Sequence, residues 1–347
     1  MFSHLKISAL SAPLRFNFFM KTLSIAFQTN KPIRAYGALA QRVEALGFDG
    51  VTVYNDMLYQ PAWLPLFEMA KATERVRIGV AAVNPFTCHP INIAGNIALI
   101  DEAAPGRVYL GLARGAWLDY VGVKPSQPIR ALREAFAAVR HLLSGSAESL
   151  SGTIFPIAGG DRLRWDAAIR PKIPFLLGTW GVKTMRACLP LVDEIKLGGT
   201  ANPDVVGWLR TQMGAQRDKG IVIGAVTVVD EDGNAARQLA RREVALYLPV
   251  VAELDPTVTI EPDRLQRLKA AAAAYEFDRA ADLVSDALLD RFAFAGTPQQ
   301  VAEQTIRLFA AGADRVEFGT PHGVSAENGL HLLGTKTLPI IKQALNG

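Results

Sequence analysis

The sequence predicts an α/β protein built as a parallel (β/α)8 TIM barrel with insertions, and two observations support this prediction. Apolar strand-like runs alternate with helical runs along almost the whole chain, and eight of them have the length and composition of strands. Most of these runs end in polar or glycine-rich residues, as in α/β barrels, where the carboxyl ends of the strands carry the chemistry. An open doubly wound sheet is the alternative, but Gln28–Pro32 follows the first strand in place of a Gly-x-Gly-x-x-Gly turn.

The first half of the chain contains four strands and four helices in strict alternation. Gly47 and the pair Pro105-Gly106 are helix-stop signals, and a polar loop at Arg114–Gln127 leads into the fourth helix. The third strand is the clearest, because its apolar run breaks abruptly into Asn84-Pro85. The predicted strands are Leu23–Gln28, Gly50–Asn55, Val76–Val83 and Val108–Ala113, and the predicted helices are Ile33–Leu46, Trp63–Thr73, Ile91–Ala103 and Ile129–Leu143.

The second half of the chain continues the alternation but contains two insertions. Residues 145–172 are rich in Gly, Ser and Pro, and two short strands are predicted there, Thr153–Ile157 and Leu163–Trp165. The Ala-rich stretch Asn234–Phe294 is predicted to be helical with breaks near Pro256 and Pro262, and residues 250–295 form the second insertion. The remaining strands are Pro174–Thr179, Glu194–Leu197, Ile221–Val229 and Arg315–Gly319, and the remaining helices are Val182–Leu191, Asp204–Gln216, Pro298–Ala311 and Leu330–Ala344.

Composition limits the classes of protein to consider. Half of the residues are hydrophobic, yet no apolar run reaches the roughly 18 residues of a membrane span, so no membrane association is expected. Cys88 and Cys188 form neither a disulfide framework nor a metal-ligand cluster, so we expect a cytoplasmic protein without a metal. The net charge of +4 is dispersed, which argues against nucleic acid as a partner. Residues 20–347 are predicted to form one domain, and residues 1–19 are interpreted as an upstream start or a disordered extension.

The predicted strand ends are polar and rich in glycine but poor in carboxylates. Asp56 and Asp230 are the two acidic residues among them. The sequence contains no paired-carboxylate arrangement, no Gly-x-Ser-x-Gly elbow and no histidine-rich metal set at these ends. A site without a strong acid, base or metal of its own indicates that a cofactor supplies the chemistry for a small-molecule substrate.

The turn after the fifth predicted strand is a candidate phosphate site. Glycines let backbone N–H groups approach an anion, and the start of the next helix adds a favourable dipole, although an ordinary βα turn has the same pattern. The residues of this turn with a predicted binding role are Gly178, Thr179, Trp180, Gly181 and Thr184.

Single residues at other strand ends have both functional and structural interpretations. Asp56 is a candidate acid/base or orienting group, or the cap of a turn. Arg114-Gly115 fits an anion contact or a surface ion pair. His322 is a candidate substrate contact, and Trp63 is a candidate wall for a planar ligand, or a packing residue. His89 is interpreted as structural, and Cys88 has no partner pattern for a nucleophile.

Several sequence pieces, in this order, resemble the bacterial luciferase-like flavin and deazaflavin oxidoreductases. The resemblance extends over roughly residues 20–345. Within this family, the chain most resembles the branch of the coenzyme F420-dependent methylene-tetrahydromethanopterin reductases and their relatives. Each piece alone is weak, but the ordered set is specific. The pieces are Ala45–Gly50, Thr73–Gly79, Asn84–Pro90, Leu99–Glu102, Leu110–Ala116, Ala131–Ala135, Leu142–Gly145 and Pro174–Thr184.

The resemblance implies a luciferase-like barrel with a bound deazaflavin, coenzyme F420, or with FMN as the alternative. It implies a non-proline cis peptide in the third strand, placed by motif alignment at Ala81-Ala82 to within one residue, with the ring packed against this site. Further cofactor contacts are implied at the rim and in the following loop: Asn84, Thr87, Arg114, Gly115 and Asp119. The resemblance also implies that Asp56 is the family's acidic residue at the second strand end, and that the chain forms a homodimer or a higher homo-oligomer.

Two departures from the family pattern limit the reaction. Sugar-phosphate dehydrogenases of the group have His and Glu where this chain has Met57 and Ala116, so the acid/base pair for alcohol oxidation is missing. We therefore expect hydride transfer between F420 and an unidentified organic substrate, as in a methylene-tetrahydromethanopterin reductase. The alternatives are an FMN-dependent monooxygenase with a flavin reductase as partner, and a non-catalytic barrel that binds a phosphorylated ligand.

Overall fold

The computed structural model describes residues 21–116, 118–165, 169–216 and 218–346. The predicted extension at residues 1–19 lies outside the described residues. In the described ranges, no helix is long and apolar enough to cross a membrane.

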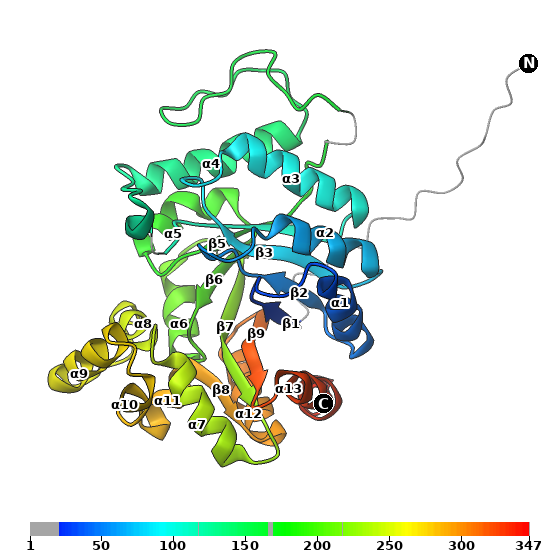
Figure 1. Ribbon diagram of the computed structural model, residues 1–347. Coiled ribbons are helices and arrows are strands. Elements are labelled where there is room, and N and C mark those ends of the chain that lie inside the picture. Colours follow the sequence, from blue (N-terminus) through cyan, green and yellow to red (C-terminus); the bar gives the residue numbers. More distant parts are fainter. Residues whose placement is uncertain (1–20, 117, 166–168, 217, 347) are drawn as a thin grey trace, which may run out of the picture.

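Eight parallel strands close into a barrel, which confirms the predicted fold class and excludes the open doubly wound sheet (Figure 1). Seven of them pair in chain order, and the barrel closes where the last strand pairs with both the first and the seventh. The barrel strands are β1 (Thr22–Phe27), β2 (Gly50–Val53), β3 (Arg77–Val83), β4 (Val108–Ala113), β5 (Phe175–Gly178), β6 (Glu194–Gly198), β7 (Gly220–Val229) and β9 (Arg315–Gly323).

Helices surround the barrel and bury its outer face (Figure 1). Their ends follow local signals. Gly47 has φ 87° just after the first helix, and Thr297 and Gln300 form a capping box at the start of α12. The covering helices are α1 (Ala35–Ala45), α2 (Trp63–Ala72), α3 (Pro90–Ala103), α4 (Pro128–Leu143), α5 (Val182–Cys188), α6 (Pro203–Gln212), α12 (Pro298–Ala310), α13 (Ala326–Leu332) and α14 (Leu338–Asn346).

A ninth strand, β8 (Ala293–Gly296), lies at the end of the stretch predicted to be helical. That part of the prediction is wrong. Ala293 and Phe294 pair with Val226 and Thr227 of β7, so β8 extends the sheet outside the barrel. An Ala-Phe-Ala-Gly run has no strand signal of its own, and its conformation is set by the neighbouring strand.

The rest of the stretch Asn234–Phe294, which includes the second insertion, is mainly helical, as predicted. Its helices pack on one another around a core of their own and lie at the lower left of Figure 1. They are α7 (Gly233–Val244), α8 (Leu248–Leu254), α9 (Pro262–Ala273), α10 (Phe277–Ala281) and α11 (Asp286–Phe292).

The two short strands predicted within residues 145–172 do not form. A single bridge between Leu150 and Ile157 is the strand-like feature of the described part of this insertion. The backbone N–H groups of Ile154 and Phe155 donate to the Glu134 carboxylate at 2.7 and 3.1 Å. A side chain of α4 thus takes the place of a partner strand.

Candidate active site

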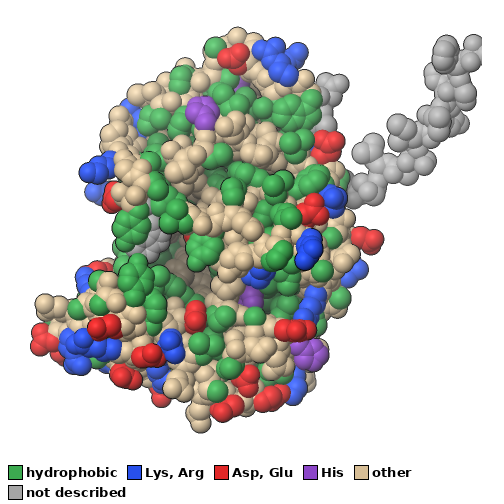
Figure 2. Space-filling view, in the orientation of Figure 1, with side chains coloured by type: hydrophobic (Ala, Val, Ile, Leu, Met, Phe, Trp, Pro, Cys, Tyr) green, Lys and Arg blue, Asp and Glu red, His purple; other side chains and the backbone are tan. Residues whose placement is uncertain are grey.

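A large cavity lies over the carboxyl ends of β1, β2, β7 and β9, between the barrel and the helical insertion. Its volume is about 1420 Å³, and Figure 2 shows the molecule hollowed beside the lobe that carries α8 to α10. The residues that line it are Phe27, Gln28, Asn30, Lys31, Leu39, Arg42, Asp56, Met57, Tyr59, Ala116, Val226, Arg242, Glu243, Leu246, Tyr247, Val250, Val251, Phe277, Thr320, Pro321, His322, Ala326, Glu327 and Leu330.

The two sides of this cavity differ in chemistry. The wall from the insertion is mainly apolar and aromatic, with Leu246 and Tyr247 between α7 and α8, Val250 on α8 and Phe277 on α10, and it also carries Arg242 and Glu243 of α7. The side from the barrel carries more polar groups, Asp56 and His322 among them, beside apolar residues such as Phe27 and Leu330. Apolar walls with a few polar groups are typical of small-molecule sites.

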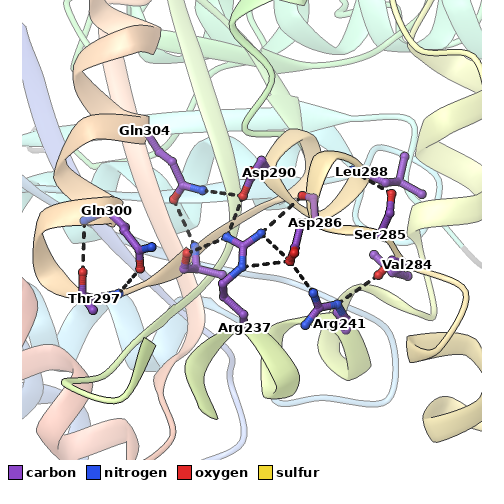
Figure 3. Close-up of polar contacts among 11 residues, drawn as sticks. Arg237, Arg241, Val284, Ser285, Asp286, Leu288, Asp290, Thr297, Gln300 and Gln304 are labelled. Carbon is purple, nitrogen blue, oxygen red and sulfur yellow. Dashed lines mark hydrogen bonds and ion pairs between the residues drawn. The ribbon is translucent and has the colours of Figure 1, made fainter. Parts of the chain in front are cut away.

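Ion pairs join two helices of the insertion, and a hydrogen bond connects them to β8 (Figure 3). Arg237 of α7 donates to Asp286 and Asp290 of α11 at 2.9 and 2.7 Å, and to the Ala295 carbonyl of β8 at 3.3 Å. Arg241, one turn along α7, also pairs with Asp286. Arg237 and Arg241 hold the pKa of Asp286 below its ordinary value, so this carboxylate stays charged. The contacts fix α7 and α11, and with them the wall, against β8.

His322 lies in this cavity, as the sequence suggested, and is almost fully buried. Its Nε2 donates to the Ala26 carbonyl oxygen at 3.0 Å, and its ring packs edge-on against Phe27. Burial, with the charge of Lys31 nearby, lowers its pKa to about 4. His322 is therefore neutral at pH 7 and holds the end of β9 against β1.

The buried histidine predicts a pH dependence of stability. Its folded pKa of about 4 lies below the unfolded value, so the unfolded chain binds more protons between these two values. The contribution of the neutral, buried His322 to the free energy of unfolding is then complete above about pH 6.5 and is lost as the pH falls. We expect wild type to lose about 2 kcal/mol more than His322→Gln between pH 7 and pH 5. Urea unfolding of both proteins at the two pH values measures this, and equal losses would contradict it.

Asp56 lies at the mouth of the barrel, exposed and just beyond the end of β2. Its Oδ2 accepts a hydrogen bond from Gln28 Nε2 at 2.7 Å, which ties the loops after β1 and β2 together. Both residues line the cavity. The predicted catalytic carboxylate is thus beside the space where a ligand fits, oriented by an amide.

The ends of β3, β4 and β5 form a second surface, which has few side-chain atoms. The peptide bond between Ala81 and Ala82 is cis, which confirms the sequence prediction. These two residues are half-buried in a strand that is otherwise buried. A Cβ at Gly178 would lie 3.4 Å from Ala113 Cβ and 4.0 Å from Ala82 Cβ, so three strand ends present small residues side by side.

Asn84 and its neighbours build the rim of this surface. Asn84 is buried, and its Oδ1 accepts from the Phe86 and Thr87 amides at 3.0 and 2.9 Å and from the Thr87 hydroxyl at 3.1 Å. A Cβ at Gly115 would lie 3.1 Å from Asn84 Nδ2. The Asn84 oxygen is therefore used within its own turn, which limits it to donating through Nδ2.

The loop after β4 carries the remaining predicted contacts at the surface. Arg114 and Asp119 are exposed, and Asp119 lies in the 3-10 turn Leu118–Val121. Neither residue lines the large cavity. His89 caps α3 by accepting from the Ile91 amide at 3.2 Å, as its structural interpretation predicted.

The turn after β5 brings two threonine hydroxyls to the start of α5. Thr179 Oγ1 accepts from the Gly181 amide at 3.1 Å, and a Cβ at Gly181 would meet Thr184 Oγ1 at 3.3 Å. Trp180 donates from Nε1 to the Gly198 carbonyl at 3.1 Å and packs between the two cores. The residues that could hold a phosphate are thus together and accessible.

Trp63 does not lie at the cavity, where a substrate contact was predicted. It begins α2, is half-buried and packs against the barrel core. It is not among the residues that line the cavity. Among the described residues there is also no group of three ligands that could hold a metal ion.

A set of charged side chains inside the barrel was missed from the sequence. Lys196 pairs with Glu317, which also accepts from Thr52 Oγ1 at 2.5 Å. One layer below, Glu194 pairs with Arg77 at 3.3 Å and with Arg315 at 2.9 Å. The sequence did contain a signal for these charges: charged residues alternate along two predicted strands, β6 and β9. Because alternate strand residues face the same side, this pattern indicates charges inside the barrel.

Burial and pairing oppose each other in these carboxylates. Burial alone would raise the pKa of Glu317, but Lys196 and Arg315 hold it below its ordinary value. Burial would likewise raise the pKa of Glu194, and Arg315 and Arg77 lower it. Both carboxylates are therefore charged, and their ion pairs share the barrel interior with a small apolar cluster of Tyr109, Leu176 and Val222.

The fold and the position of the cavity define a barrel enzyme, with its site at the carboxyl ends of the strands. The sequence model of the luciferase-like monooxygenase family matches residues 15–315, and the chain belongs to this family.

Several known proteins are similar to this chain over nearly their whole length. The 5,10-methylenetetrahydromethanopterin reductase of Methanolobus tindarius is 24% identical over 328 residues, which are 91% of this chain and 99% of the reductase. The solved coenzyme F420-dependent tetrahydromethanopterin reductase of Methanopyrus kandleri has a TM-score of 0.83 at 20% identity, covering 92% and 99% of the two chains. An F420-dependent secondary alcohol dehydrogenase with an F420-acetone adduct has a TM-score of 0.72 at 19% identity, covering 93% and 99%.

Proposed function

We propose that this protein is an oxidoreductase that transfers hydride between coenzyme F420 and an organic substrate bound in the large cavity. The observation that carries the proposal is the division of the barrel mouth into two adjoining parts. A surface poor in side chains, at Ala81, Ala82 and Gly178, lies beside a large cavity with apolar and polar walls. A planar ring fits the first part, and a separate organic molecule fits the second. The F420-dependent relatives support the same cofactor.

The residues present suit such a cofactor. Ala81 and Ala82 would back the ring, and the turn at Thr179, Gly181 and Thr184 would hold its phosphate by hydroxyl and amide donors. The deazaflavin supplies hydride transfer at its ring when bound. This chain's own residues bind and orient the two molecules, with Gln28 fixing Asp56 at the cavity edge. By the same resemblance, we propose that the enzyme works in the cytoplasm as a homo-oligomer.

A second candidate is an FMN-dependent monooxygenase, which the name of the matched family favours. The same surface would accept either ring, since neither Ala81 nor Ala82 distinguishes the two by a side-chain contact. A flavin reductase would then be a partner.

Cofactor binding tests the proposal directly. We expect oxidised F420 to bind more tightly than FMN when each is titrated into the purified protein and fluorescence quenching is followed. Tighter FMN binding with oxygen consumption would support the monooxygenase instead. Failure of both to bind would favour a barrel that binds another phosphorylated ligand.

A substitution in the turn after β5 tests whether this turn binds the phosphate of the cofactor. Gly181→Leu places a branched side chain against Thr184 and should weaken F420 binding by about tenfold or more, which is about 1.4 kcal/mol. Gly207→Leu is the control, because Gly207 lies on the exposed side of α6 with no atom near its Cβ position. Equal affinities of the two variants would reject the turn as the phosphate site.

A further inference from the structure

Tyr54 stands at the junction of the two parts of the barrel mouth. It follows Val53, whose register partner on β3 is Val80, the residue before Ala81. Its amide donates to the Phe27 carbonyl at 3.0 Å, which fixes its backbone on β1. A Cβ at Gly319 of β9 would lie 2.6 Å from the Tyr54 hydroxyl oxygen. The ring therefore reaches across β1 toward β9, and the missing side chain at Gly319 makes room for it.

Residues next to Gly319 line the cavity, although Tyr54 itself is not among the lining residues. Gly319 is followed by Thr320 on β9 and packs against Ala225 of β7, whose neighbour is Val226. Thr320 and Val226 both line the cavity. Tyr54 is half-buried, and among the described residues its hydroxyl has no hydrogen-bond partner. A phenol in this position has its donor available to a ligand between Ala81 and the cavity.

The charged interior of the barrel positions the ring. Lys196 Nζ lies 5.4 Å from the Tyr54 ring centroid, in cation–π range, and the same ammonium pairs with Glu317. Thr52, two residues before Tyr54, donates to that Glu317 carboxylate at 2.5 Å. The pair is thus the support on which the phenol rests, which gives these buried charges a task that an apolar core would not perform.

The groups around the hydroxyl keep it protonated. Burial raises the pKa of Tyr54 well above its ordinary value, and Glu317 on β9, Tyr247 between α7 and α8, Asp56 and Tyr109 on β4 raise it further. Lys196 on β6 is the cation that faces the ring. A phenol that stays neutral over the whole working range of pH is a hydrogen-bond donor and an acid.

We propose that Tyr54 is the proton donor of the site and that the Lys196–Glu317 pair is its positioning support. The inference rests on the proposed function, with reduced F420 as the reductant. Reduction of a C=O or C=N bond adds a hydride at carbon, and the π electron pair moves to the heteroatom. The heteroatom takes the proton from Tyr54 Oη, and the phenolate regains a proton from water in the cavity. Tyr54 thereby supplies the acid that Met57 and Ala116 do not, and the substrate class is a carbonyl compound or a neutral imine.

Fluorine NMR of protein labelled with 3-fluorotyrosine tests this without a known substrate. The chain has seven tyrosines, and Tyr54→Phe assigns the Tyr54 signal by its loss. We expect that signal to titrate at a higher pH than free 3-fluorotyrosine, and to shift when oxidised F420 saturates the protein. Glu317→Gln should lower the pH at which it titrates, because the carboxylate charge is gone.

The outcomes separate this inference from the proposed function. If F420 binds by fluorescence quenching but the Tyr54 signal does not move, or if that signal titrates like the free amino acid, the role of Tyr54 is overturned and the cofactor proposal stands. If neither F420 nor FMN binds, both are overturned. For a ketone or imine that wild type reduces, Tyr54→Phe should lower kcat by about 100-fold or more at similar KM. The exposed Tyr275→Phe should change neither.

Discussion

Replacing Glu317 by alanine should lower the free energy of unfolding by about 3–5 kcal/mol, because it leaves a buried ammonium without its partner. Glu317 is fully buried and Lys196 is 8% exposed, so water cannot replace the lost carboxylate. The loss of the hydrogen bond from Thr52 adds to this cost. Urea unfolding followed by circular dichroism measures the change, provided that the urea dependence stays similar.

Two controls separate the buried charge from the loss of packing. Replacing both partners, by Lys196→Met with Glu317→Leu, should restore most of the stability, since well-packed apolar residues often equal a buried ion pair. Glu253→Ala breaks the exposed pair with Lys269 and should cost less than about 1 kcal/mol. A loss in Glu317→Ala no larger than in Glu253→Ala would show that the barrel interior is hydrated.

Gly111→Ala should both destabilise the protein and weaken F420 binding. A Cβ at Gly111 would lie 2.3 Å from the Val80 carbonyl oxygen and 3.2 Å from Ala81 Cα, so the backbone of β3 must move. We expect a loss of about 1–3 kcal/mol of stability from overpacking. Because Ala81 is part of the proposed ring surface, we also expect F420 affinity to fall by about tenfold or more.

Gly207→Ala is the matched control for this substitution. Gly207 lies within α6, and no heavy atom stands within 4 Å of its Cβ position. Alanine should stabilise that helix by about 0.5–1 kcal/mol and leave F420 binding unchanged. Thermal unfolding and a fluorescence titration report the two effects, and a Gly111→Ala protein that binds F420 like Gly207→Ala would place the ring elsewhere.

Much of the fold could be predicted because the local signals agree with the global pattern. The eight barrel strands lie where apolar runs were read, within a few residues at their ends. The ninth strand could not be predicted, since Ala293–Gly296 takes its conformation from β7. The strands predicted at 153–157 and 163–165 failed for the converse reason, because strand-like composition there has no neighbour with which to pair.

The site was predictable in part for a similar physical reason. Residues at strand ends are placed by the barrel itself, so Asp56 and His322 lie at the mouth as expected. The wall formed by Leu246, Tyr247 and Phe277 depends on how α7 to α10 pack, which no local pattern encodes. To predict the place of Tyr54 and of the charges beneath it, one would need the direction of each strand side chain and the register between strands.

The path of the chain around the helical insertion has a consequence for how such enzymes diversify. The chain leaves β7 after Val229 and returns through β8, whose Gly296 pairs with Val229 itself. The five helices together with β8 therefore form an exchangeable cassette whose two ends meet beside Val229. Replacing such a cassette costs little in chain-closure entropy, since that cost grows only slowly with length. One recombination event could thus give the barrel a new substrate wall while Tyr54 and the small residues of β3 and β5 keep their places.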